Sequence, residues 1–408
     1  MVTPPTPISR GYIVCLKKQC ASAHSRADSE ADDGRNRACR TVAAARGAKI
    51  ANVCCSEVFN GFSCRGELSA DCLGALKDMT EAGEIDHVEP DFEVRACMAN
   101  SFPDATMGKR APWGVERVGT LDRASTTKIG GSDRAPGVDV DVFVLDTGVE
   151  STHPYLNVAS VKSVLDAETE PNDLNGHGTM CAGIIGAIDR GWASGETIDV
   201  VGVAPGARIH GVKVLDKDGA GFLSDIISGV EEIVRFKRDH PDASVVANLS
   251  LGGYVGTTNY TALDQEIVEA AEKHKIAFVI AAGNDSSDAA LVSPAHVKEA
   301  ITVGSYDRHN RFSSFSNYGH AVDILAPGTD IQTTTIGSTV ATASGTSFAA
   351  PFVSGAAALY VAARKSNHDQ CVSPTQVAGA ILSCARNTPL VTSVPHGTSK
   401  LSVDVTSI

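Results

Sequence analysis

Three short segments of the chain carry side chains that could perform nucleophilic catalysis. Asp146 begins an Asp-Thr-Gly segment, His177 begins a His-Gly-Thr segment, and Ser347 lies in the run Gly-Thr-Ser-Phe-Ala-Ala-Pro. A serine hydroxyl is a weak nucleophile near neutral pH, so it needs a neighbouring base, which a third group must orient. Aspartate, histidine and serine supply these functions, and their order here is one of the known triad orders. The segments therefore predict a triad of Asp146, His177 and Ser347.

Each of the three residues also has an ordinary structural explanation. Asp146 could form a turn after a strand, and His177 could be a buried structural histidine at the start of an apolar helix. Ser347 could simply cap the helix expected over 348–365. The triad is favoured because all three residues occur together, in order and with glycine, threonine or alanine neighbours.

The elements that must position these side chains alternate between strands and helices. Short apolar runs at 140–146, 209–215, 245–249, 276–281 and 301–303 are typical of buried parallel strands. Between them, we expect Ser224 to cap a helix over 225–238 and Thr261 to cap one over 262–275. This alternation predicts an α/β fold, with a doubly wound, mostly parallel sheet and helices on both faces. Asp146 would then lie at the carboxyl edge of the sheet, where such folds form their sites.

The three segments and their order resemble the subtilisin family of serine proteases. The run Ala-Pro-Trp-Gly-Val at 111–115 resembles the start of the mature domain in proteinase K-like members. The resemblance implies a serine endopeptidase that hydrolyses proteins and peptides through an acyl-enzyme on Ser347. It implies no cofactor for catalysis, a monomer, and a secreted or extracellular enzyme.

The same resemblance implies further site residues. Asn284 follows an Ala-Ala-Gly segment and would donate its side-chain N–H to the oxyanion, together with the backbone N–H of Ser347. Asp323 would bind a structural calcium ion with the carbonyls of Lys298 and Ala300, although it could also be a surface turn residue. Two backbone segments would clamp an extended substrate, and a third would line the pocket for the residue before the cleaved bond. These substrate-binding residues are Gly219, Ala220, Gly221, Ser250, Leu251, Gly252, Ala281, Ala282 and Gly283.

The first hundred residues form a separate unit. Residues 11–96 show the order β-α-β-β-α-β, which predicts a small α+β, ferredoxin-like domain. Its segments 59–63 and 88–91 resemble the inhibitory propeptide of subtilases, which implies a zymogen inhibited by its own propeptide. The predicted division is a disordered N-terminus at 1–10, the propeptide domain at 11–96, a flexible processing linker at 97–110 and the peptidase domain at 111–408.

The cysteines leave two interpretations open. Eight of the 11 cysteines lie before residue 100. Such density favours disulfides in an oxidising compartment, but reduced, partly buried thiols explain it as well. Near the C-terminus, a helix over 374–385 would keep Cys371 and Cys384 too far apart for a disulfide.

Composition excludes several other classes of function. The net charge is −13 and no Lys/Arg cluster occurs, so nucleic acid is not expected as a partner. No apolar run approaches the length of a membrane span, so we expect no membrane insertion. The first seven residues lack the basic start and apolar core of a secretory signal, which means either an intracellular protein or a gene product that starts further upstream.

Three rival functions remain. A catalytically silent relative that only binds peptides or proteins is the main alternative, although the complete triad and Asn284 argue against it. A lipase or esterase of the α/β-hydrolase kind would need G-x-S-x-G and the order Ser, Asp, His. A cysteine protease would need Cys181 as nucleophile, but it lies four residues after His177 on the same predicted helix.

Overall fold

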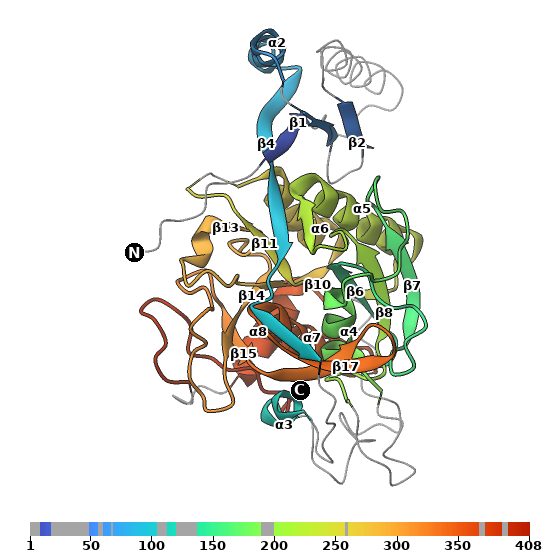
Figure 1. Ribbon diagram of the computed structural model, residues 1–408, viewed down its shortest axis with the longest axis vertical. Helices are drawn as coiled ribbons and strands as arrows, with labels where there is room; N and C mark the ends of the chain where they lie inside the picture. The colour runs from blue at the N-terminus through green and yellow to red at the C-terminus, as the bar shows by residue number, and fades with distance from the viewer. Residues whose placement is uncertain are drawn as a thin grey trace.

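The protein forms two lobes, a small one that contains β1, β2, β3, α2 and the first part of β4, and a larger one that contains the remaining elements (Figure 1). The computed structural model describes residues 9–17, 49–55, 60–66, 68–103, 112–119, 137–188, 200–257, 260–366, 372–385 and 391–408.

A seven-stranded parallel sheet forms the centre of the large lobe. Its order is β15-β14-β12-β10-β6-β8-β7, and every neighbouring pair is parallel. All seven residues of the central β6 are buried, as expected for a strand covered on both faces. The strands are β6 (Val140–Asp146), β7 (Val158–Ser163), β8 (Arg208–Lys213), β10 (Ser244–Leu249), β12 (Ala277–Ala281), β14 (Ile301–Tyr306) and β15 (Ile324–Pro327).

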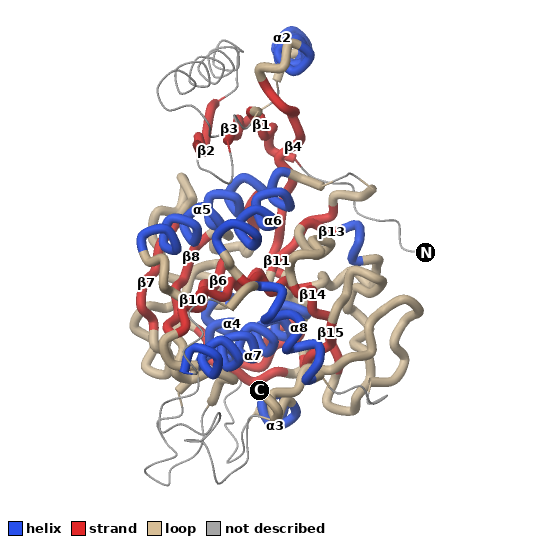
Figure 2. The backbone as a smooth tube through the Cα atoms, turned by 180° about the vertical axis from the view of Figure 1, so that it is seen from behind, coloured by secondary structure: helices blue, strands red, loops and turns tan. Residues whose placement is uncertain are grey.

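Helices cover both faces of this sheet (Figure 2). One face packs against α4 (His177–Gly186), α7 (Thr346–Ser366) and α8 (Pro374–Cys384). The other packs against α5 (Leu223–Asp239) and α6 (Ala262–His274), and each layer encloses its own apolar core. The predicted doubly wound α/β fold is confirmed.

Helix α7 corrects the expectation that no segment is long and apolar enough to cross a membrane. The 20-residue stretch Thr346–Lys365 contains an 18-residue window with a mean hydropathy of 1.4. However, 83% of that window is buried inside the protein. The helix packs against α4 and the central strands, so its apolar character follows from its place in the core.

The predicted helix starts are correct for α6 but wrong for α5. Thr261 caps α6, and its hydroxyl accepts a hydrogen bond from Asp264 N. Helix α5 begins one residue before Ser224, and the Asp225 carboxylate accepts from Phe222 N. Ser224 donates its own N–H to a carboxylate from the small lobe, so no cap was required at that position.

The small lobe has antiparallel strands in the order β4-β1-β3-β2. Its core joins apolar residues of β1, β3 and α2. The first predicted helix and residues 1–8 lie outside the described residues. The elements are β1 (Ser9–Leu16), β2 (Lys49–Cys55), β3 (Asn60–Arg65), α2 (Ala70–Glu81) and β4 (Ile85–Ala96).

Four cysteines near the N-terminus, Cys15, Cys64, Cys72 and Cys97, carry free, buried thiols. For these four, the structure agrees with the reduced-thiol interpretation. Cys20 and Cys39 lie outside the described residues, the structure describes no side chains for Cys54 and Cys55, and Cys371 is also outside the description.

Strand β4 continues from the small lobe into the large one (Figure 1). It pairs antiparallel with β9 (Ala220–Phe222) and β11 (Leu251–Tyr254), and β11 pairs with β13 (Val292–Ser293). The described part of the predicted flexible linker is ordered, because residues 100–103 form β5 (Asn100–Pro103). This strand pairs with β17 (Thr339–Ser344), which forms a hairpin with β16 (Ile331–Thr335).

Two short helical segments complete the described elements. They are α3 (Trp113–Arg117) and the single 3₁₀ turn η2 (Ala289–Leu291).

Candidate active site

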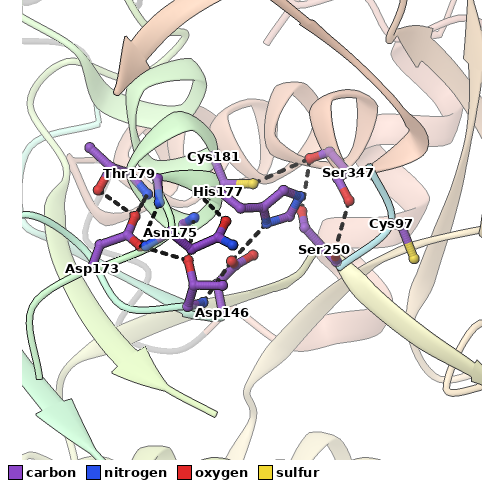
Figure 3. A network of polar contacts seen from close by, with 12 residues as sticks. Cys97, Asp146, Asp173, Asn175, His177, Thr179, Cys181, Ser250 and Ser347 are labelled. Atoms are coloured by element: carbon purple, nitrogen blue, oxygen red, sulfur yellow. Dashed lines mark hydrogen bonds and ion pairs between the residues drawn. The ribbon is translucent and has the colours of Figure 1, made fainter. Parts of the chain in front are cut away.

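Asp146 and His177 meet at the carboxyl edge of the parallel sheet (Figure 3). Asp146 ends β6 and His177 begins α4, and both side chains are fully buried. The Asp146 Oδ1 atom lies 2.7 Å from His177 Nδ1. A Cβ on Gly178 would lie 2.0 Å from the Gly148 carbonyl oxygen, so glycine lets α4 approach this edge. The carboxylate thus leaves His177 Nε2 free to exchange a proton, and no described residue bonds to it.

Asp173 is a buried carboxylate that sequence reasoning missed (Figure 3). Its Oδ1 accepts from Thr147 Oγ1 at 2.9 Å and from the N–H of Asn175 and Gly176. Its Oδ2 accepts from both the N–H and the hydroxyl of Thr179. One side chain therefore ties the turn after Asp146 to the first turn of the helix that begins at His177. The signal in the sequence was an aspartate shortly before an expected helix, since negative charge is favoured near a helix N-terminus.

Ser347 lies in the first turn of α7 and is fully buried. Its hydroxyl donates to the Ser250 carbonyl at 2.8 Å, and not to His177. Its own carbonyl accepts from Ser250 Oγ at 2.8 Å. A change to another staggered side-chain rotamer would be needed to redirect the Ser347 hydroxyl.

Two donors converge on the carbonyl oxygen of Cys97. Ser347 N donates to it over 3.2 Å, and the side-chain Nδ2 of Asn284 donates as well. The Asn284 amide is held in this orientation because its Oδ1 accepts from Thr346 N and Oγ1, both at 2.9 Å. A Cβ on Gly345 would lie 2.4 Å from the Cys97 oxygen, so the approach requires glycine. The site thus holds a peptide carbonyl between two donors at a helix N-terminus.

The chain around Cys97 pairs as an added strand with the two backbone segments that were predicted to bind substrate. Val94 and Arg95 of β4 pair with Gly221 and Ala220. On the other side, Ala96 pairs with Leu251. The backbone N–H of Ala96 donates to Gly219 O and that of Cys97 to Ser250 O, both at 3.0 Å. This arrangement is the β-augmentation by which an extended peptide binds a sheet edge.

The side chain of Cys97 is buried beside Gly252. Its Sγ lies 3.8 Å from the position that a Cβ on Gly252 would take, and Val292 lies beside the same position. Ala281 and Ala282, which precede Gly283 and Asn284 in the sequence, are fully buried. Gly283 has a φ of 101°, and its N–H donates to Thr346 Oγ1, so this glycine supports the turn that carries Asn284.

Cys181 lies beside the Asp146–His177 pair (Figure 3). One ligand atom from each of the three lies within 4.8 Å of the others, a spacing that could hold a metal ion. Burial, and then the nearby Asp146 charge, raise the pKa of the Cys181 thiol well above its usual value. The thiol donates to the Ser347 carbonyl at 3.5 Å. A protonated thiol is neither a nucleophile nor a metal ligand, so these contacts favour a packing role.

Asp323 lies outside this cluster, at the start of β15. Its Oδ2 accepts from Thr302 N at 2.8 Å. Burial raises the pKa of the Asp323 carboxyl to about 6, which outweighs the opposing effect of this hydrogen bond. A half-buried carboxylate of this kind is suited to a cation that would compensate its charge.

A buried Asp–His pair, a serine at a helix N-terminus and two donors around one carbonyl oxygen are the groups that a serine hydrolase requires. Residues 137–400 match the model of the subtilase family. An alkaline serine protease of Corniculantispora psalliotae is 37% identical over 305 residues, which is 74% of this chain and 71% of that protein. Proteinase R of Parengyodontium album is 38% identical over 61% of this chain and 60% of its own length.

Two further similarities extend this match. The cuticle-degrading protease of Metarhizium anisopliae is 34% identical over 83% of this chain and 79% of its own. The crystal structure of a cold-adapted subtilisin-like serine proteinase superposes with a TM-score of 0.60 at 34% identity, over 73% of this chain and 99% of that one. The chain belongs to the subtilase family, with proteinase K-like relatives, and is a serine endopeptidase of protein and peptide substrates. Catalysis in this family requires no cofactor.

Proposed function

We propose that Ser347 is the nucleophile, His177 the general base and Asp146 the group that orients and stabilises the imidazole. The Ser347 hydroxyl would leave the Ser250 carbonyl, donate to His177 Nε2 and attack the bound carbonyl carbon. Asn284 Nδ2 and Ser347 N would stabilise the oxyanion, and their hydrogen bonds to Cys97 O support this role. The proton then passes from His177 to the leaving amide nitrogen, and water hydrolyses the ester on Ser347.

We further propose that the chain is a zymogen whose own first substrate is the Cys97–Met98 bond. The observation that carries this proposal is the Cys97 carbonyl oxygen between the two oxyanion donors. Residues 11–96 would be the inhibitory propeptide, and the bond falls at the upstream end of the segment 97–110 assigned to processing. The cut would leave residues 98–408, which contain the peptidase domain at 111–408, active without the small lobe.

Contacts of β4 with two helices of the large lobe support the inhibitory role. Asp91 is fully buried and accepts from Ser224 N at 3.0 Å and Ser224 Oγ at 2.8 Å, at the start of α5. Glu89 accepts from Ala262 N at 2.9 Å, at the start of α6. Helix N-termini have unpaired N–H groups and favour negative charge. The two carboxylates therefore satisfy donors that the peptidase domain leaves unpaired within each helix.

The buried position of Cys97 supports a preference for small, apolar residues immediately before the cleaved bond. The residue is 8% exposed, and both its Sγ and Val292 lie close to Gly252. A bulky or charged side chain would displace Val292 or lose its hydration. Burial raises the pKa of the Cys97 thiol, so this cysteine enters the pocket as an uncharged group.

Three finer properties follow from the family alone and remain proposals. Asp323 would bind a structural calcium ion with the carbonyls of Lys298 and Ala300. The mature enzyme would be a monomer, and it would be secreted.

Labelling with a fluorophosphonate tests the assignment of the nucleophile. The processed enzyme should carry one phosphonyl group, and peptide mass analysis should locate it on Ser347. A chain in which Ser286, an exposed loop serine near Asn284, is replaced by alanine should label at the same rate. Labelling at another residue, or undiminished labelling of Ser347→Ala, would refute the assignment.

A further inference from the structure

Asn317 is a fully buried amide that takes no part in the proposed chemical steps. It lies in the loop between β14 and β15, which are neighbouring parallel strands of the central sheet (Figure 1). Its side chain reaches the segment 282–287, which carries the oxyanion donor Asn284. A buried amide has both N–H donors and an acceptor oxygen to satisfy, so its partners show what it holds in place.

The partners of Asn317 lie on both sides of Asn284 in the sequence. Before Asn284, the Nδ2 atom of Asn317 donates to Ala282 O at 2.9 Å. After Asn284, the Oδ1 atom of Asn317 accepts from Asp285 N at 2.9 Å and from Ser287 N at 3.0 Å. The Ser287 hydroxyl also donates to this oxygen, over 3.3 Å. One side chain therefore brackets the stretch of backbone that carries Asn284.

These contacts require an amide, because the same planar group donates at one end and accepts at the other. An ionised carboxylate would lose the donor to Ala282 O, and an aliphatic side chain would lose every bond. The close fit also requires glycine at position 283, since a Cβ on Gly283 would lie 2.3 Å from Asn317 Nδ2. The turn before Asn284 is therefore built around this amide.

Backbone bonds would keep the two loops together even without this side chain. Asn317 N donates to Gly283 O at 2.9 Å, and Tyr318 N donates to Ser287 O at 3.0 Å. A substitution at position 317 keeps both bonds, so the fold should survive it. What the substitution removes is the hold on residues 282, 285 and 287, which flank Asn284.

We propose that Asn317 is a positioning residue, which fixes the backbone at 282–285 so that Asn284 Nδ2 points at the oxyanion. This inference rests on the proposed function, because it assumes that Asn284 stabilises the oxyanion. Thr346 holds the amide oxygen of Asn284, and Asn317 holds the main chain from which that side chain extends. Precise placement matters here, because displacing a preorganised group by about 1 Å can cost about a hundredfold in rate.

A double-mutant cycle on self-cleavage of the full chain tests this proposal. The rate constant for cleavage of the Cys97–Met98 bond is followed by intact mass after refolding of the denatured chain, for the parent, Asn284→Ala, Asn317→Ala and the double variant. Loss of one oxyanion donor should slow cleavage about a hundred- to a thousandfold, and Asn317→Ala about ten- to a hundredfold. If Asn317 acts through Asn284, its replacement in the Asn284→Ala chain should slow cleavage by less than about threefold.

Two further variants separate the hydrogen bonds from packing and from general changes in the loop. Asn317→Leu keeps the branched shape of the side chain but makes none of its bonds, so it should slow cleavage about as much as Asn317→Ala. If either variant fails to fold, the other completes the cycle. Ser286→Ala is the matched control, because it removes an exposed hydroxyl of the same loop that donates to Ser314 O. Its rate should stay within about twofold of the parent.

The outcomes separate this proposal from the proposed function. An equal fractional loss of rate from the change at Asn317 in the parent and in the Asn284→Ala chain would overturn the positioning role, because the effect would then not pass through Asn284. Cleavage of Asn317→Leu at the parent rate would also overturn it, because the hydrogen bonds would then be dispensable. If Asn284→Ala itself cleaves as fast as the parent, the oxyanion assignment in the proposed function fails.

Discussion

Loss of the Asp91 carboxylate should weaken the hold of the small lobe on the peptidase domain. In the complex, Asp91→Ala removes the acceptors for Ser224 N and Ser224 Oγ, both buried. Arg10 also loses one of its two carboxylate partners but keeps Asp225. Removal of a helix-capping side chain costs about 0.5–2 kcal/mol, and a buried donor without a partner costs about 1–3 kcal/mol. We therefore expect about 3 kcal/mol, or roughly a 150-fold rise in the inhibition constant.

The assay adds separately produced residues 1–97 to the processed enzyme and measures the inhibition constant from hydrolysis of a peptide substrate. Asp91→Asn should have a smaller effect than Asp91→Ala, because its amide oxygen can still accept one bond. Glu93→Gln is the matched control, because Glu93 lies on the same strand and pairs with Arg95 of that strand. Inhibition by Asp91→Ala as tight as that by the unaltered fragment would refute the capping argument.

Three further predictions concern the site and its supports. Asp173→Asn should lower kcat about ten- to a hundredfold with little change in KM, because an amide cannot accept all the bonds that order the first turn of α4. Asp216→Asn alters a loop carboxylate that also accepts backbone hydrogen bonds, and it should lower kcat less. Equal losses of kcat in the two variants would argue against the role of Asp173. Gly345→Ala should slow self-cleavage at least a hundredfold, since the new methyl group would overlap the Cys97 oxygen, and unchanged intact-mass kinetics would contradict this. The raised pKa of Asp323, about 6, means that the folded chain binds this proton more tightly than the unfolded chain, so in chelator the stability should fall as pH rises from about 4 through 6. Calcium should restore the Tm above pH 6 in the parent but not in Asp323→Asn. A parent Tm that does not respond to calcium would argue against a calcium ion at Asp323.

The sequence was most informative where chemistry restricts residue type. The segments around Asp146, His177 and Ser347 could be recognised because a nucleophile, a base and glycine-rich turns permit few alternatives. The strands of the parallel sheet were visible as apolar runs because they are covered on both faces.

Features that depend on distant segments were not predictable from local pattern. Ser224 is a residue type that often caps helices, but Asp225 accepts the hydrogen bond from Phe222 N at the start of α5. The N–H of Ser224 instead donates to Asp91, which lies 133 residues away in the sequence. Residues 100–103 are polar enough to suggest a flexible linker, yet they form a strand because β17 offers an open edge. The choice of Cys97 among the residues of the linker likewise depends on the register of β4 between β9 and β11.

With Ser347 as the nucleophile, the chain should cut itself at Cys97–Met98. The most direct measurement is the intact mass and N-terminal sequence of the purified full chain, compared with those of Ser347→Ala prepared without added protease. Self-cleavage by Ser347 should give a large fragment that begins at Met98 in the parent and an uncut chain in the variant. A large fragment with another first residue, or efficient cleavage of the Ser347→Ala chain, would contradict it.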